Sequence, residues 1–156
     1  MIDFKRLIWV DRDQVKNIPH DVKTWLYDEK SLTKKLKNKF KIFSVNVLSQ
    51  RKIVLSSDEE SFLMQDGLCM EREVELIGDG NTVVYARSVI PETADTEQLL
   101  NIGVKPLGEV LFNSPSVTRG VFQIANINGI WGRRSIFTLG NTKILVSEFF
   151  LDSLFS

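Results

Sequence analysis

Two arginines lie inside runs of residues that otherwise favour buried β-strands. Side chains alternate between the two faces of a strand, which places Arg72 in an apolar stripe with Val74 and Arg87 in a stripe with Tyr85. A buried charge without a partner is costly, so each arginine should meet an anion. Guanidinium groups match carboxylates in a bidentate fashion, and a small acid with two carboxylates would suit such a pair.

The two arginines belong to the two halves of a predicted hairpin, whose turn is the run Gly78-Asp79-Gly80-Asn81. If Ile77 pairs with Thr82 across this turn, Arg72 falls opposite Arg87 on the same face. Like charges in that position repel each other. Two interpretations stay open: an anionic ligand covers the pair, or nearby Asp and Glu side chains neutralise both arginines.

Glu148 is the third candidate for chemistry. It lies in the C-terminal run 144–151, two residues from both Val146 and Phe150, and residues on both faces of this run are apolar. We therefore expect Glu148 to be buried, and such a glutamate must be paired, hydrogen-bonded or protonated. Arginine can hold charge in place and glutamate can take or share a proton. Together they could bind a small acid or assist an elimination.

Other kinds of site find little support. His20 is the only histidine and Cys69 the only cysteine, so we expect no metal cluster and no disulfide framework. His20 follows Pro19, which is typical of a surface residue at a helix start, and Cys69 should be inert. The sequence has no Walker loop, dinucleotide fingerprint or serine elbow. We expect a site without a metal or an organic cofactor.

Size and charge limit the partners. The chain has 156 residues, of which 43% are hydrophobic and 26% charged, and we expect a single domain over residues 1–156. Its formal net charge is zero, which argues against nucleic-acid and membrane-surface partners. A lysine-rich segment at 34–41 could form a nucleic-acid patch, but a solvated helix face is the simpler interpretation. No run resembles a signal peptide or could span a membrane, so we expect a cytoplasmic protein.

The elements that position these residues alternate between short helices and strands. Helices are predicted over residues 19–26, 31–40, 96–100 and 107–112. Strands are predicted over 43–50 and 121–124 and in two hairpins, 70–89 and 136–151. The acidic segment 56–67 is interpreted as a loop.

Several motifs together resemble chorismate lyase, and the resemblance covers nearly the whole chain. The most specific is Trp131-Gly132-Arg133-Arg134-Ser135 followed by Glu148-Phe149-Phe150-Leu151. The others are Ser31-Leu32-Thr33-Lys34, Arg72-Glu73, Arg87-Ser88-Val89-Ile90-Pro91 and Pro106-Leu107-Gly108 with Leu111-Phe112.

This resemblance implies an α+β fold, in which a single antiparallel sheet and helical flaps enclose an internal ligand cavity. It implies a monomer that needs no cofactor and that eliminates pyruvate from chorismate, giving 4-hydroxybenzoate for ubiquinone synthesis. Family ligand contacts carry over to Leu32, Arg72, Glu148 and the backbone of Leu107. A role for Arg87 in holding a second carboxylate follows only from the expected hairpin register.

On this interpretation Arg72 anchors a carboxylate, while Glu148 holds the ring hydroxyl and is the candidate acceptor for the ring proton. A cavity closed by flaps also predicts slow release of product and therefore product inhibition. The main alternative is a non-catalytic effector-binding domain of the same fold type, as found in bacterial regulators. A structural relative that has lost its activity is a third possibility.

Overall fold

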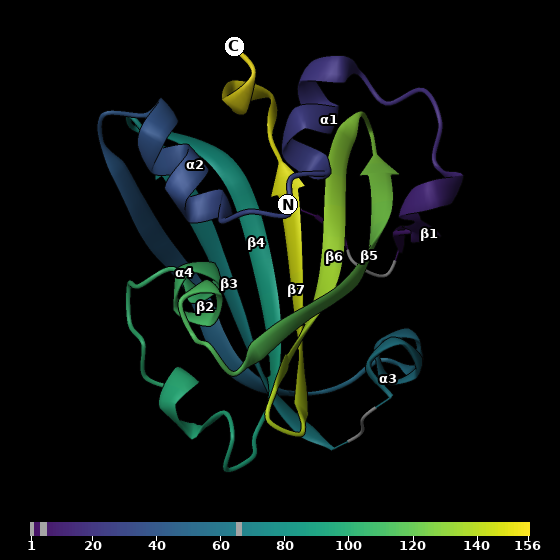
Figure 1. Cartoon of the computed structure of the whole chain (residues 1–156), viewed down its shortest axis with the longest axis vertical. Coiled ribbons are helices and arrows are strands. Elements are labelled where there is room, and N and C mark those ends of the chain that lie inside the picture. Colours follow the sequence, from purple (N-terminus) through teal and green to yellow (C-terminus); the bar gives the residue numbers. More distant parts are fainter. Residues whose placement is uncertain (1, 4–5, 65–66) are drawn as a thin grey trace.

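The computed structural model describes residues 2–3, 6–64 and 67–156 (Figure 1). Within this part of the chain, seven strands form one antiparallel sheet in the order β1-β5-β6-β7-β4-β3-β2. The strands are β1 (Val10–Asp11), β2 (Phe43–Val54), β3 (Leu68–Gly78), β4 (Asn81–Pro91), β5 (Val117–Ile127), β6 (Ile130–Leu139) and β7 (Thr142–Phe150). The predicted α+β class with a single antiparallel sheet is confirmed.

Helices cover both faces of this sheet. They are α1 (His20–Leu26), α2 (Leu32–Lys39), α3 (Ser57–Leu63) and α4 (Leu107–Phe112), with short 3-10 turns at Arg12–Gln14, Glu97–Leu99 and Asp152–Leu154. Buried side chains of α1, α2 and α4 pack in the clusters on one face, and Leu63 of α3 packs on the other. No helix among the described residues is long and apolar enough to cross a membrane.

Two of the helices on the first face, α2 and α4, form where the sequence predicts them. Ser31 caps α2, because its side chain accepts a hydrogen bond of 3.2 Å from the backbone N–H of Lys34. Leu36 of α2 is fully buried. Pro106 precedes α4, where its missing N–H costs nothing, and Leu111 is buried beneath the helix.

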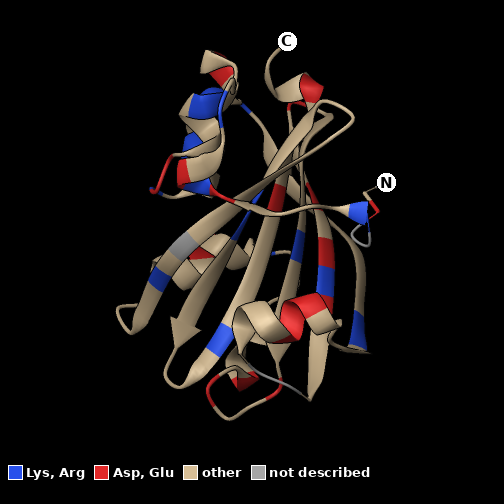
Figure 2. Ribbon diagram, turned by 90° about the vertical axis from the view of Figure 1, so that its right-hand side faces the viewer, with Lys and Arg blue, Asp and Glu red and all other residues tan. Residues whose placement is uncertain are grey.

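The acidic segment interpreted as a loop instead contains α3. Ser56 caps this helix by accepting a hydrogen bond of 3.2 Å from the backbone N–H of Glu59. The Ser-x-x-Glu spacing is that of a capping box, and three acidic residues in the first turn interact favourably with the helix dipole. Figure 2 shows this acidic turn in front of the sheet. Residues 65–66 of the predicted loop lie outside the described residues.

The β3–β4 hairpin forms as predicted, but its register differs. Ile77 pairs with Thr82, and a β-bulge beside this pair then shifts the register, so that Arg72 pairs with Ser88. A shift of one residue moves a side chain to the opposite face of the sheet. The expectation that Arg72 and Arg87 face one another is therefore wrong, and Arg87 lies on the face that α3 covers.

Candidate active site

A cavity of about 50 Å³ lies between the sheet and the helices α2 and α4. Strands β3 to β7 supply its floor, and the first turns of α2 and α4 supply its roof. The cavity residues used below are Leu32, Arg72, Leu107, Arg119, Arg133, Phe137 and Glu148. The helical cover over an internal cavity, expected from the resemblance, is thus present.

Four of the five predicted ligand contacts line this cavity: Leu32, Arg72, Leu107 and Glu148. Arg72 comes from β3 and Glu148 from β7, with β4 between them, yet both side chains are on the same face of the sheet. The fifth residue, Arg87, does not reach the cavity, because the hairpin bulge turns it to the other face.

Arg72 is a buried cation that lacks an acidic partner in the part of the chain that the structure describes. Its side chain is 2% exposed, and its Nη2 donates a hydrogen bond of 3.0 Å to the backbone carbonyl of Lys105. A longer contact of 3.4 Å joins Nη1 to the amide oxygen of Gln50. Within the described residues no carboxylate forms an ion pair with Arg72, and burial lowers the pKa of its guanidinium. Such a group is suited to bind a carboxylate of a ligand.

Glu148 is held by Arg133, which lies directly opposite it on β6. The Nε of Arg133 donates a hydrogen bond of 2.9 Å to Oε1 of Glu148, whose side chain is 12% exposed. The Nη1 of Arg133 also donates to the backbone carbonyls of Trp25, Leu26 and Asp28 at the end of α1. Glu148 is therefore paired and mostly buried, as its apolar neighbours predicted, and its carboxylate is fixed in orientation.

Arg119 of β5 also lines the cavity, although no pattern in the sequence indicated it. Its Nη2 donates to the hydroxyl of Ser135 at 3.2 Å, and its Nη1 to the backbone carbonyl of Glu29 at 3.4 Å. Its Nε is buried without a hydrogen-bond partner among the described residues. A bulge between Arg119 and Phe122 interrupts the alternation of β5, which hid the face to which Arg119 belongs.

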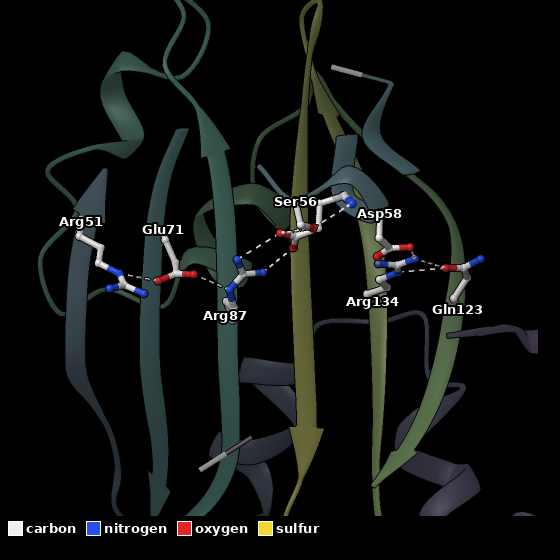
Figure 3. Close-up of polar contacts among 8 residues, drawn as sticks. Arg51, Ser56, Asp58, Glu71, Arg87, Gln123 and Arg134 are labelled. Atoms are coloured by element: carbon white, nitrogen blue, oxygen red, sulfur yellow. Dashed lines mark hydrogen bonds and ion pairs between the residues drawn. The ribbon is translucent and has the colours of Figure 1, made fainter. Parts of the chain in front are cut away.

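Arg87 belongs to a network of ion pairs on the opposite face (Figure 3). Its Nε donates a hydrogen bond of 2.7 Å to Glu71, and its Nη1 donates to Glu59 of α3. Glu71 also accepts from Arg51 at 2.9 Å. Burial alone would raise the pKa of Glu71, but hydrogen bonds and charges from Arg87 and Arg51 outweigh burial and lower it. Of the two interpretations left open, acidic neighbours account for Arg87 and leave Arg72 unexplained.

The cavity as a whole is strongly cationic. Among its lining residues, Lys30, Arg72, Arg119 and Arg133 are basic and Glu148 is acidic. Since Arg133 is paired with Glu148, the positive charge that remains suits an anion with more than one acidic group. One oriented carboxylate beside that anion could accept a proton from it or hold a hydroxyl group.

A family model described as chorismate lyase matches residues 4–156. The chain belongs to the chorismate lyase family. A "Probable chorismate pyruvate-lyase" of Pseudoalteromonas translucida is 36% identical and aligns with 84% of this chain and 84% of its own length. A protein of the same name from Pseudomonas fluorescens is 36% identical over 96% of this chain and 89% of its own length. One from Shewanella frigidimarina is 32% identical over 93% and 88%.

The most specific motif of this chorismate lyase family member is divided between the two faces of the sheet. Arg133 points to the cavity. Arg134 instead donates to Asp58 of α3 at 2.7 Å (Figure 3). It also stacks over the ring of Phe62, at 4.1 Å from the centroid. Gly132 precedes them because a Cβ there would lie 2.4 Å from the ring of Phe149. The motif therefore combines one residue of the site with one that fixes α3.

Proposed function

We propose that this chain converts chorismate to 4-hydroxybenzoate and pyruvate, the first committed step of ubiquinone synthesis. The observation that carries the proposal is the shared cavity of Arg72 and Glu148 in a member of the chorismate lyase family. We further propose that the chain acts in the cytoplasm as a monomer and without a cofactor.

The reaction depends more on the positioning of the substrate than on strong acids or bases. Chorismate carries a carboxylate on C1, an enolpyruvyl ether on C3 and a hydroxyl on C4. Elimination breaks the C3–O bond and removes the C4 hydrogen as a proton, while the departing enolate takes up a proton on carbon to become pyruvate. Because the ring becomes aromatic, the protein mainly orients the substrate and stabilises charge on the departing group.

In the proposed mechanism, Arg72 and Glu148 hold opposite ends of the ring. Two strand spacings separate β3 from β7, which corresponds to roughly 10 Å between backbones. In the proposed pose Arg72 binds the C1 carboxylate with its fork of N–H groups. Glu148 holds the C4 hydroxyl and is placed to accept the C4 proton, while Arg133 keeps its carboxylate in position.

Leu32 and Leu107 complete the pose from the roof of the cavity. The cavity of about 50 Å³ is smaller than one of about 150 Å³ that holds benzene. Helices α2 and α4 must therefore move apart to admit a six-membered ring. An opening step of this kind commonly limits turnover, which supports slow release of 4-hydroxybenzoate and inhibition by it.

The test is to incubate the purified protein with chorismate and measure both products. Ultraviolet absorbance follows 4-hydroxybenzoate, and a coupled lactate dehydrogenase assay follows pyruvate in equal amount. Binding of chorismate without conversion would support the effector-domain alternative instead.

A second measurement tests the role of Glu148. Glu148→Gln keeps the size of the side chain but removes its basicity, so turnover should fall by roughly 100-fold or more. Calorimetric titration should show that 4-hydroxybenzoate still binds. Full activity of this variant would exclude Glu148 as the base.

A further inference from the structure

Arg119 has no role in the pose described so far, yet it presents a cation to the same cavity. Its guanidinium is held in place by Ser135 and by the ring of Phe137, whose centroid lies 5.3 Å away. Among the residues that the structure describes, no carboxylate forms an ion pair with Arg119. Its Nε is buried and makes no hydrogen bond to them. An oriented guanidinium with a free donor is a binding group for an anion.

The strand order gives Arg119 a definite place relative to the proposed pose. Arg72 is on β3 and Arg119 on β5, and Glu148 is on β7, two strands from each of them. Across the floor the order is thus Arg72, then Glu148 with its paired Arg133, and then Arg119. Arg119 donates to the backbone carbonyl of Glu29. The neighbouring carbonyl, that of Asp28, accepts from Arg133, which is paired with Glu148. Arg119 therefore lies at the Glu148 end of the cavity.

Chorismate has two carboxylates and one hydroxyl that could meet these side chains. Its C1 carboxylate is at one end of the ring and its C4 hydroxyl at the other. The enolpyruvyl ether on C3 is next to that hydroxyl and carries the second carboxylate. With the C1 carboxylate on Arg72 and the hydroxyl on Glu148, the enolpyruvyl carboxylate extends beyond Glu148.

We propose that Arg119 binds the enolpyruvyl carboxylate of the substrate, the part that leaves as pyruvate. This inference rests on the proposed function and deepens it, because it assigns a residue to the leaving group. Arg119 holds the ether over the site before the C3–O bond breaks. It also stabilises the negative charge that develops on the departing oxygen and its side chain. Arg72, by contrast, contacts the carboxylate that stays on the product.

The two arginines should therefore differ in one measurable way. The product 4-hydroxybenzoate keeps the carboxylate assigned to Arg72 and lacks the one assigned to Arg119. Removing Arg119 should weaken use of chorismate and leave product binding unchanged. Removing Arg72 should weaken both.

The experiment compares Arg119→Met, Arg119→Lys and wild type by kcat/KM for chorismate and by Kd for 4-hydroxybenzoate. Arg119→Met should lower kcat/KM by roughly 100-fold to 1,000-fold, while Kd for the product changes less than about threefold. Arg119→Lys keeps a positive charge and should recover part of the loss. Arg51→Gln is the matched control, because Arg51 is an arginine of the same sheet that contacts Glu71 on the other face, and its kcat/KM should equal that of wild type.

Product binding also shows that each variant is folded. Unchanged turnover in Arg119→Met would overturn the inference, and so would a product affinity that falls as much as turnover does. An Arg119→Lys variant no better than Arg119→Met would overturn the assignment of a carboxylate to this residue. Failure of the proposed function is a different result: wild type itself would then release no pyruvate from chorismate.

Discussion

The two faces of the sheet differ in the partners of their buried arginines. Of the three arginines that line the cavity, Arg133 alone forms an ion pair with a carboxylate of the described residues, that of Glu148. On the face covered by α3, Arg87 and Arg134 are buried and each forms an ion pair with a carboxylate (Figure 3). On the cavity face, Arg72 and Arg119 donate to carbonyl and hydroxyl oxygens, and no carboxylate of the described chain forms an ion pair with either. The presence of a buried arginine therefore says little about function here. Whether that arginine has a carboxylate partner says more.

The difference has an energetic meaning. Desolvating a cation is costly, and hydrogen bonds to neutral groups offset less of that cost than a carboxylate does. The paired arginines stabilise the fold by fixing α3 to the sheet. Arg72 and Arg119 weaken the fold unless a ligand brings the missing negative charge. Mutation of Arg72 or Arg119 on the cavity face should thus lower activity, whereas mutation of a paired arginine on the α3 face should lower stability.

The largest expected effect is the loss of activity in Arg72→Met. We expect kcat/KM for chorismate to fall by at least about 1,000-fold, because the anchor of the ring carboxylate is gone. The free energy of unfolding, measured by urea denaturation, should stay the same or rise, since an unpaired buried charge is replaced by an apolar chain of similar length. Turnover close to that of wild type would remove Arg72 from the site.

The reverse pattern is expected for Arg87→Met. This change leaves Glu71 and Glu59 without their buried partner, so the free energy of unfolding should fall by about 3–5 kcal/mol in urea titrations. The fraction that remains folded should keep the kcat/KM of wild type. The double variant Glu71→Gln/Arg87→Met should recover part of the stability, since it removes one of the uncompensated charges. An active-site defect without a loss of stability would mean that Arg87 contacts the substrate.

The sequence predicted the helices and strands better than it predicted the face of the sheet to which each side chain points. Alternation and turn residues located both hairpins, and the apolar neighbours of Glu148 predicted a buried, paired carboxylate. Alternation assigns a face only while the register is continuous, and one bulge beside Ile77 was enough to misplace Arg87. A second bulge after Arg119 concealed a cavity residue in the same way.

Two further features were missed for different reasons. The helix α3 carried a readable signal, the Ser56-x-x-Glu59 capping box, that its acidic composition obscured. The pairing of Arg133 with Glu148 depends on the register of β6 and β7, which the turn between them leaves open. Local patterns do not state which residues meet across strands, and this is why family resemblance located Leu32 and Leu107 where physical reasoning did not.

A change of pH should weaken the α3 face through Glu71. Its pKa in the folded protein lies below the ordinary value of 4.5, so the unfolded chain takes up the proton first as pH falls. The stability that Glu71 contributes is complete above about pH 4.5 and is lost as pH falls through the lower, folded pKa. In urea titrations Glu71→Gln should be less stable than wild type at pH 7, and the difference should shrink below pH 4.5. A difference that is constant with pH would contradict this role.

The smallest effect is expected where the two cover helices of the cavity meet. Lys37 of α2 and Glu109 of α4 form an ion pair of 3.1 Å, and their side chains are 51% and 38% exposed. Exposed pairs contribute about 0.2–1 kcal/mol, so Lys37→Gln should speed the dissociation of 4-hydroxybenzoate by no more than about fivefold, as measured by stopped-flow fluorescence. High salt should speed wild type by a similar factor, because salt screens exposed charges, and it should add little to the variant. A much larger effect would mean that the Lys37–Glu109 pair holds the cavity closed. We expect instead that the apolar contacts of Leu32 and Leu107 in the roof hold it closed. Lys37→Gln should not lower kcat/KM for chorismate as Arg72→Met does. The pair joins α2 to α4 at the surface and does not reach the cavity floor.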